Sequence, residues 1–337
     1  MRIVYVVFGQ VTVADGRAEA PHASVRYRVL RPAEPMARHG WTVTILTINP
    51  QTPLAQAHTA LDGCDLAVLS SPLSPVAERL QAMARSYGAR TVLDICDNHF
   101  TGSALEASYR VLCRDAHGVI APTSELAETV HAATGRYADV IPDPVEGHRG
   151  VPSFPTDASP LRMLWFGGST NLDTLPGVVH ALSPIAATRP VALTLVTAPH
   201  PDIRAFLAAL PPNFAGQLVP WSPEALWTAL AKSHAVILPS LDHPLKRGKS
   251  ANRLTEALWA GRWVVAHPLP AYAAWSDTAG VANDLGQALL WGLAHPNIVL
   301  RHIAAAQERI AQTLSIETIS AQWMALFKDV VGRGVPR

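Results

Sequence analysis

The sequence has few charged residues, no marked excess of either sign and no long hydrophobic run. Charged residues make up 16% of its 337 residues, and the formal net charge is +1. This balance excludes a global basic field of the kind that grips nucleic acid or an anionic membrane, although it leaves room for a local patch. Charges, prolines and histidines interrupt every apolar stretch before the roughly 18 residues that a membrane span requires. We therefore expect a soluble, cytoplasmic protein, with peripheral contact at the inner membrane face as the open alternative.

Cysteine is also scarce. Cys64, Cys96 and Cys113 lack the spacing of a metal or redox motif, which favours a reducing compartment. The opening run IVYVVFG is too short for the core and cleavage site of a signal peptide, and it is rich in β-branched residues. It is typical of a buried strand.

The sequence is rich in apolar residues, and they follow a regular alternation of strand and helix patterns. Apolar residues make up 49% of the sequence, which excludes a mainly disordered chain, and the length is about twice that of a usual domain. Short β-branched runs alternate with longer segments of helical period, the pattern of parallel sheets covered by helices. The strands are expected near 2–8, 42–48, 65–70, 90–96, 117–121 and 138–141, and again near 161–166, 191–197, 216–220, 234–239 and 263–266. The helices are expected near 24–39, 74–87, 103–115, 123–133, 172–187, 202–210, 222–232, 249–260 and 297–330.

This alternation predicts an α/β protein with two Rossmann-like domains that face each other across a cleft. The first domain is expected to span residues 1–146 and the second 161–310, joined by a linker over 147–160 that is crowded with proline, glycine and aspartate. A C-terminal helix over 311–337 is expected to pack back on the first domain and so to strap the domains together. Ligands in such sheets lie outside the carboxyl ends of the strands, so the turns that follow strands are the places to search for a site.

The most informative turn follows the strand predicted at 234–239. It carries Lys246, Arg247 and Lys249, and a helix is expected to open near Ser250, whose hydroxyl can cap the first turn. At 100° per residue, Lys249, Asn252, Arg253 and Glu256 fall on one polar face of this helix. Helix amides and cations could receive a diphosphate, while Glu256 could accept hydrogen bonds from ribose hydroxyls. The simpler alternative is a solvated face whose charges merely pair.

Other phosphate and catalytic motifs are incomplete. The tripeptide GKS at 248–250 matches the last three residues of a Walker A phosphate-binding loop. That loop needs a glycine five positions before Gly248, and this chain has His243 there, which argues against a P-loop NTPase. The stretch GGSTN at 167–171 resembles the G-x-S-x-G nucleophile elbow of hydrolases, but Asn171 stands in place of its last glycine. Neither predicted first strand is followed by the glycine fingerprint of a dinucleotide-binding fold, which weakens a dehydrogenase interpretation.

The stretch KSANRLTEALWAGRWVVA at 249–266 resembles the donor-site segment of GT-B glycosyltransferases, in particular the retaining group called glycosyltransferase family 4. Weaker likenesses are SVRYRVLRPAEPMARHGWTVTIL, VIAPTSELAETV and ADVIPDPVE in the first half, so that the resemblance spans about 300 residues. It implies transfer of a sugar from a UDP- or GDP-linked donor to a hydroxyl acceptor, with retention at the anomeric carbon. The acceptor could be a glycan, a lipid-linked molecule or a small molecule. The resemblance implies no tightly bound cofactor and no metal ion, and makes 161–310 the donor domain and 1–146 the acceptor side.

Two departures from the family's pattern concern the donor. Gly248 stands where many members have a glutamate that contacts the donor sugar, and the stretch FGGSTNLD at 166–173 lacks the cations that members commonly carry there. Lys249 or Arg247 is expected to replace the missing charge. The predicted donor contacts are Arg247, Lys249, Ser250, Ala251, Asn252 and Glu256, with Gly168 and Ser169 in the glycine turn and Trp221 near the base.

On the first domain, Asp94, Asp97, Asn98 and His99 cluster where a predicted strand ends. The resemblance implies that a polar residue here touches the donor sugar or the acceptor hydroxyl, and Asp97 and His99 are the predicted catalytic residues. Local turn capping by the aspartates is the structural alternative.

Four residues after the first strand complete the predicted site. Gly9 and Gln10, with Arg26 and Tyr27 of the next helix, are the predicted acceptor contacts. A surface basic patch that includes Arg26, Arg28, Arg31 and Arg38, and that could approach an anionic acceptor or a membrane surface, is an alternative for this region. Two other functions stay open, namely a nucleotide-sugar epimerase and a non-catalytic binding protein on the same fold.

Overall fold

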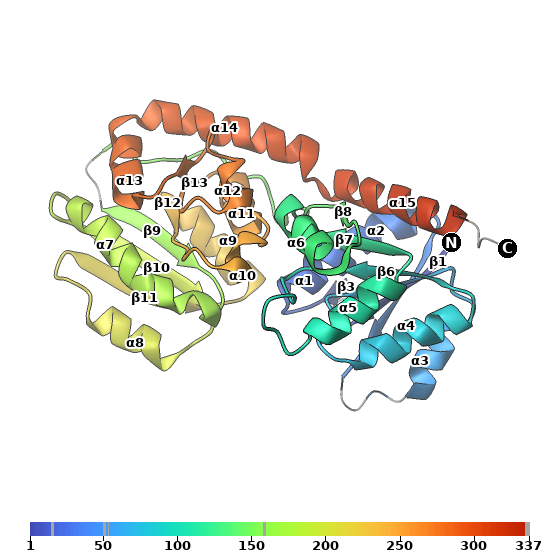
Figure 1. The fold of residues 1–337 in the computed structure, drawn as a ribbon. Coiled ribbons are helices and arrows are strands. Elements are labelled where there is room, and N and C mark those ends of the chain that lie inside the picture. Colours follow the sequence, from blue (N-terminus) through green and yellow to red (C-terminus); the bar gives the residue numbers. More distant parts are fainter. Residues whose placement is uncertain (15–16, 50–51, 53, 158–159, 334–337) are drawn as a thin grey trace. The chain divides into compact units, whose positions relative to one another are not determined.

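The computed structural model describes residues 1–14, 17–49, 52, 54–157 and 160–333 (Figure 1). The chain forms two compact units. The first comprises Met1–Pro144, the short segment Arg247–Ser250 and the chain from Thr313 onward; the second comprises Val145–Lys246 and Ala251–Gln312. The segment Arg247–Ser250 therefore belongs to the first unit, although both of its neighbours in the sequence belong to the second.

The first unit is built on a parallel sheet. Its strands lie in the order β4 (Thr42–Thr47), β1 (Arg2–Val7), β5 (Leu66–Ser70), β6 (Arg90–Asp94), β7 (Gly118–Ala121) and β8 (Asp139–Val140). Strand β5 is buried along its whole length, because helices cover both faces of a parallel sheet. The chain order reverses between β1 and β5, and ligands of such sheets bind beside this kind of reversal.

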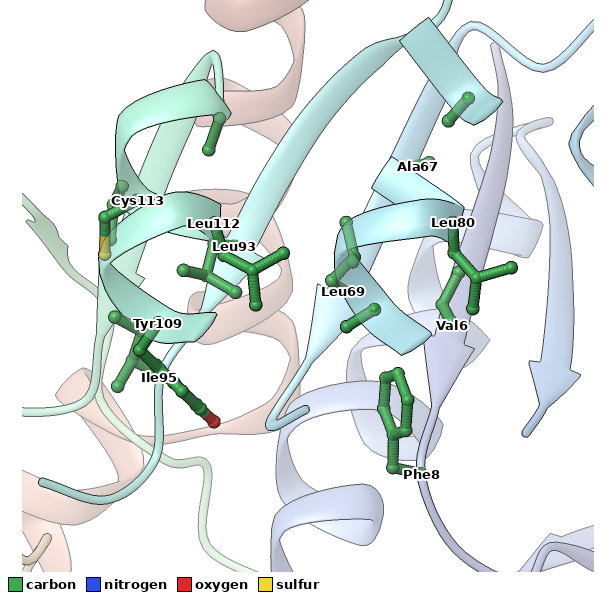
Figure 2. Close-up of a cluster of buried hydrophobic side chains, with 14 of the residues drawn as sticks. Val6, Phe8, Ala67, Leu69, Leu80, Leu93, Ile95, Tyr109, Leu112 and Cys113 are labelled. Carbon is green, nitrogen blue, oxygen red and sulfur yellow. The ribbon is translucent and has the colours of Figure 1, made fainter. Parts of the chain in front are cut away.

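Helices and one hairpin complete the first unit. They are the hairpin β2 (Thr12–Ala14) with β3 (Arg17–Glu19), α1 (Ala23–Val25), the π-helical turn η1 (Arg26–Leu30), α2 (Arg31–Arg38), α3 (Leu54–Leu61), α4 (Val76–Ser86), α5 (Glu106–Asp115), α6 (Ser124–Thr134) and α15 (Ile316–Gly332). Figure 2 shows how the sheet meets α4 and α5, with Leu69 and Leu93 close to Leu80 and Leu112 in one buried apolar cluster.

Helix α15 packs on the same unit from the far end of the sequence. It contacts α2, and Phe327 lies with its ring centroid 6.3 Å from that of Tyr5. Trp323 is fully buried. At the surface, Arg38 of α2 forms an ion pair with Glu317 at 3.2 Å. The apolar face of α15 is thus part of the core of the first unit.

The second unit contains another parallel sheet. Its strands lie in the order β11 (Phe214–Pro220), β10 (Val191–Thr197), β9 (Leu161–Phe166), β12 (Ala235–Leu238), β13 (Trp263–Ala266) and β14 (Gly280–Val281). Its helices are η2 (Ser169–Thr174, a 3₁₀ helix), α7 (Leu175–Ala186), α8 (Pro201–Ala208), α9 (Pro223–Lys232), α10 (Pro244–Arg247), α11 (Asn252–Trp259), α12 (Pro270–Ala273), α13 (Leu285–Ala294) and α14 (Pro296–Thr313). Numbered within this unit, the strand order is 3-2-1-4-5-6, that of a Rossmann sheet, so the reversal lies between β9 and β12.

The predicted fold class, an α/β protein with two Rossmann-like units, is confirmed. Each predicted strand is present, with ends within about two residues of the prediction. The sequence pattern missed the hairpin β2–β3, the strand β14, the helices α3 and α13 and the short helices α10 and α12. Among the described helices, none combines the length and the apolar composition that crossing a membrane requires.

One histidine in the second unit gives a testable consequence of this packing. His234 is buried just before β12, at the amino ends of β9 and β12, and its Nδ1 accepts a hydrogen bond from the backbone N–H of Arg162 at 3.2 Å. Burial, assisted by the charge of Arg162, lowers the pKa of His234 to about 4. Protonation of Nδ1 would also remove this acceptor.

We expect acid to destabilise the protein through His234. The folded-state pKa lies below the unfolded value of about 6.5, so the unfolded chain takes up the proton first as the pH falls from about 6.5 to 4. Stability should fall by about 1 kcal/mol per pH unit in this window. Urea unfolding at several pH values measures it. In His234→Asn, whose side-chain oxygen keeps the acceptor without titrating, this part of the loss should vanish; an unchanged pH profile would contradict the assignment.

Candidate functional site

A glycine turn opens the site in the second unit. Gly167 and Gly168 follow β9, and the 3₁₀ helix η2 begins at Ser169. Gly168 is exposed, with extended backbone, and a Cβ placed on it would meet no protein atom within 4 Å. The turn therefore leaves its backbone open to a ligand, and it lies at the switch point where ligands of this sheet type bind.

Two cations converge on this turn. Lys246, in α10, donates through Nζ to Asn171 Oδ1 at 2.6 Å and to the carbonyl of Thr170 at 3.2 Å. Arg253, in the first turn of α11, donates to the carbonyl of Phe166 at 3.3 Å. A Cβ on Gly167 would lie 3.2 Å from Nη1 of Arg253. The glycine turn therefore has a lysine and an arginine beside it, although it contains no cation of its own.

Helix α11 differs from the prediction in three ways. It begins at Asn252 rather than near Ser250, and its N-cap residue Ala251 has no side-chain cap. The prediction that Ser250 caps this helix is wrong, because its hydroxyl donates instead to Asp143. Lys249 lies outside the helix, and Glu256 is buried with 3% of its surface exposed. The predicted polar face therefore does not form as one exposed stripe, because Lys249 lies outside the helix and Glu256 is buried.

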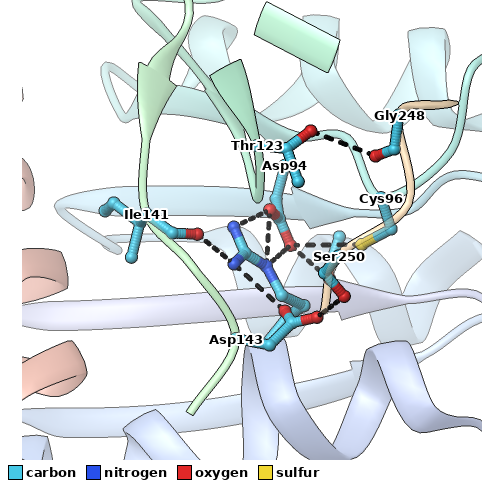
Figure 3. A network of polar contacts seen from close by, with 9 residues as sticks. Asp94, Cys96, Thr123, Ile141, Asp143, Gly248 and Ser250 are labelled. Carbon is cyan, nitrogen blue, oxygen red and sulfur yellow. Dashed lines mark hydrogen bonds and ion pairs between the residues drawn. The ribbon is translucent and has the colours of Figure 1, made fainter. Parts of the chain in front are cut away.

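The segment Arg247–Ser250 is held by three turns of the first unit. The hydroxyl of Thr123, after β7, donates to the carbonyl of Gly248 at 3.1 Å. Lys249 forms an ion pair with Asp97, after β6. The hydroxyl of Ser250 donates to Asp143 Oδ2, after β8, at 2.6 Å. Figure 3 shows the first and last of these bonds.

Of the predicted catalytic pair, Asp97 is accessible and His99 is partly enclosed. The carboxylate of Asp97 is 42% exposed. The ring of His99 packs against Tyr109 with centroids 4.3 Å apart, and its Nδ1 lies 3.4 Å from the hydroxyl of Ser103. Burial lowers the pKa of His99, an effect that Asp97 opposes and Lys249 reinforces. The lowered pKa favours the neutral imidazole, the form that can accept a proton.

The predicted acceptor residues are only partly accessible. Gln10 is exposed and Gly9 is half-buried after β1. Arg26 and Tyr27 are buried, and Arg26 donates to the carbonyls of Ala20 and Pro21 at 3.3 and 3.1 Å. Arg26 and Arg28 do not belong to a surface basic patch, because both side chains are buried in the first unit; Arg38, by contrast, is exposed.

The remaining predicted donor contacts lie at several places. Arg247 is exposed, whereas Ala251 and Asn252 are half-buried. Ser169 is exposed at the glycine turn, and Trp221 is half-buried after β11. Among the described residues, no group of three or more His, Cys, Asp or Glu side chains is arranged to hold a metal ion.

Lys246 and Arg253 were not predicted as partners of the glycine turn. The sequence pattern favours Lys249 or Arg247 as the source of its positive charge. The predicted topology could have identified them. Strands β9 and β12 flank the switch point, so the turns that follow these two strands should lie close together.

Comparison with known proteins gives structural matches only. No family model and no curated protein sequence matches the chain. Among solved structures, HepE of Anabaena in complex with UDP and glucose is 16% identical, with a TM-score of 0.69 over 98% of this chain and 100% of that one. A glycosyltransferase from Rickettsia africae is 13% identical, with a TM-score of 0.71 over 99% of both chains. An α-glucosyltransferase bound to UDP-glucose and DNA with an abasic site is 12% identical, with a TM-score of 0.66 over 97% of this chain and 99% of that one. The chain thus has the GT-B fold, the two-unit α/β architecture of these glycosyltransferases.

Proposed function

We propose that the protein is a glycosyltransferase that moves a sugar from a nucleotide-sugar donor to a hydroxyl acceptor. The observation that carries the proposal is the glycine turn at the switch point of the second unit, with Lys246 and Arg253 beside it. Open backbone and two cations suit a diphosphate, whose charge needs both amide donors and positive side chains. The solved structures with the same fold that contain UDP or UDP-glucose support this choice and make UDP the first nucleotide to test.

The chemistry follows from charge development on the leaving group. As the glycosidic bond to the diphosphate breaks, negative charge builds on the phosphate oxygens. Cations fixed beside the glycine turn interact most strongly at that moment, so they lower the barrier more than they strengthen ground-state binding. Lys246 and Arg253 serve this purpose here, and we keep Arg247, Lys249 and Ser250 as further donor contacts.

The other proposed donor contacts surround the same nucleotide. They are Gly168 and Ser169 at the phosphates, Ala251 and Asn252 at the start of α11, Glu256 at the ribose and Trp221 near the base. On the first unit, Asp97 and neutral His99 are assigned to the reacting sugar and the acceptor hydroxyl, and Gly9 and Gln10 to the acceptor. Transfer with retention is the stereochemistry we propose.

Calorimetry and a turnover assay test this function together. The purified protein is titrated with UDP, GDP and ADP, and nucleotide release from the corresponding sugar donors is then followed with and without a set of hydroxyl acceptors. We expect binding of one nucleotide and acceptor-dependent release. No binding of any of them would overturn the proposal in favour of a protein that lacks donor chemistry. A rearranged sugar nucleotide formed without acceptor would indicate an epimerase.

Gly168→Ala separates donor binding from folding. Because a Cβ at this position meets no protein atom within 4 Å and the backbone is extended, we expect unfolding free energy to change by less than about 0.5 kcal/mol. The added methyl group occupies space that the phosphate should use, so the donor KM should rise about tenfold. Steady-state kinetics with varied donor provides the measurement. Unchanged donor KM would show that no phosphate approaches this turn.

A further inference from the structure

A buried ion pair lies at the centre of the first unit. The guanidinium of Arg28 is 1% exposed and binds Asp94, which is fully buried, with Nη2 to Oδ1 at 2.7 Å and Nε to Oδ1 at 3.1 Å. Arg28 sits in the π-helical turn η1, a backbone form that often marks functional positions. The ring of Trp323 lies 4.7 Å from Cζ of Arg28. The guanidinium is therefore fixed on several sides.

The same guanidinium reaches the turn after β8. Its Nη1 donates to the carbonyl of Ile141 at 2.5 Å and to Asp143 Oδ1 at 3.3 Å. Asp143 is 10% exposed, so both of its carboxylate oxygens need donors. Arg28 donates to one oxygen, Oδ1, and the hydroxyl of Ser250 donates to the other, Oδ2, at 2.6 Å. The cation of η1 is thus linked through a single carboxylate to the segment that carries Lys249. Figure 3 shows the bond between Asp143 and Ser250.

We infer that Asp143, oriented by Arg28, is a positioning residue that fixes the segment Arg247–Ser250 for donor binding. This inference rests on the proposed function, in which Lys249 is a donor contact. A hydrogen bond to a carboxylate is strong and directional, and the bond from Ser250 sets the backbone one residue beyond Lys249. Asp143 holds the backbone beside Lys249 in one conformation before the donor binds. Binding of the diphosphate then costs less conformational entropy. Asp143 itself needs no contact with the donor.

The test uses paired variants of Ser250 and Asp143. In Ser250→Ala and Asp143→Ala, we expect the donor KM to rise about fivefold to tenfold while kcat changes by less than about twofold. The double variant should lose no more than the larger single loss, because both changes remove one interaction. Ser250→Thr keeps the hydroxyl and should restore the donor KM. Ser315→Ala is the matched control: its hydroxyl also makes a local bond in the first unit, accepting from Thr318 N–H at 3.1 Å at the start of α15.

Hydrogen exchange gives a readout that does not depend on catalysis. Peptides that cover residues 245–252 should exchange faster in Asp143→Ala and Ser250→Ala than in the wild type, and no faster in Ser315→Ala. Unchanged exchange would overturn the inference while leaving the proposed function intact. Faster exchange with unchanged donor KM would also overturn it. The variant Lys249→Ala then identifies the cause. A raised donor KM in Lys249→Ala keeps Lys249 as a donor contact, whereas an unchanged donor KM removes Lys249 from the proposed donor site.

Discussion

Lys246→Ala is expected to lower kcat/KM for the sugar nucleotide by about 100-fold, the usual cost of removing one group that stabilises transition-state charge. Lys246 is the cation that bonds directly across the glycine turn, at 2.6 Å from Asn171 Oδ1. In the proposed mechanism its charge stabilises the departing diphosphate, so most of the loss should appear in kcat rather than in donor KM. Steady-state kinetics with varied donor, together with calorimetry for the free nucleotide, measures both parts.

Lys232→Ala is the matched control for this prediction. Lys232 is an exposed lysine at the end of α9 in the same unit, near the amino ends of β9 and β12, whereas the glycine turn follows the carboxyl end of β9. Its removal changes the net charge equally and should alter kcat/KM by less than about twofold. The result that would contradict this prediction is a small effect of Lys246→Ala, like that of the control, together with a 100-fold loss of kcat/KM in Lys249→Ala. Lys249, one of the two residues favoured by the sequence, would then be the cation that stabilises the diphosphate.

The sheets could be predicted from the sequence because their cause is local. A parallel strand with both faces covered is a continuous apolar run, as in Leu66–Ser70, and such a run needs no knowledge of its partners. The hairpin at 12–19 has strands of three residues and carries too little pattern to be seen. The π-helical turn at Arg26–Leu30 could not be distinguished from the α-helix predicted over 24–39, because both present similar periodicity.

The site was harder to predict because its cause is tertiary. Lys246, Arg247 and Lys249 lie within four consecutive positions, and the sequence cannot tell which of them meets the turn after β9. The polar stripe through Glu256 assumed that α11 starts near Ser250. The hydroxyl of that residue instead bonds to Asp143, 107 residues away, and the helix starts at Asn252. Partners this distant in the sequence leave no local signal. The same holds for the pair of Arg28 and Asp94, which are 66 residues apart.

Breaking the pair between Arg28 and Asp94 should have the largest effect on stability. In Arg28→Met, the carboxylate of Asp94 stays fully buried without its cation, which typically costs about 3–5 kcal/mol of unfolding free energy. Arg28→Met/Asp94→Asn should recover part of this loss, because the amide carries no charge to compensate. Arg38→Met is the control, since its ion pair with Glu317 is 66% and 70% exposed and should contribute less than about 1 kcal/mol.

The pH dependence of this loss has a definite sign. Burial raises the pKa of Asp94, and the charge and hydrogen bonds of Arg28 oppose that rise. Without Arg28 the folded-state pKa of Asp94 should rise further above the unfolded value, so the folded variant binds a proton more readily than its unfolded chain. The stability difference between wild type and Arg28→Met should therefore shrink as the pH falls from 7 to 5. Urea unfolding at both pH values measures it, and a difference that grows on acidification would show that Asp94 does not depend on Arg28 for its charge.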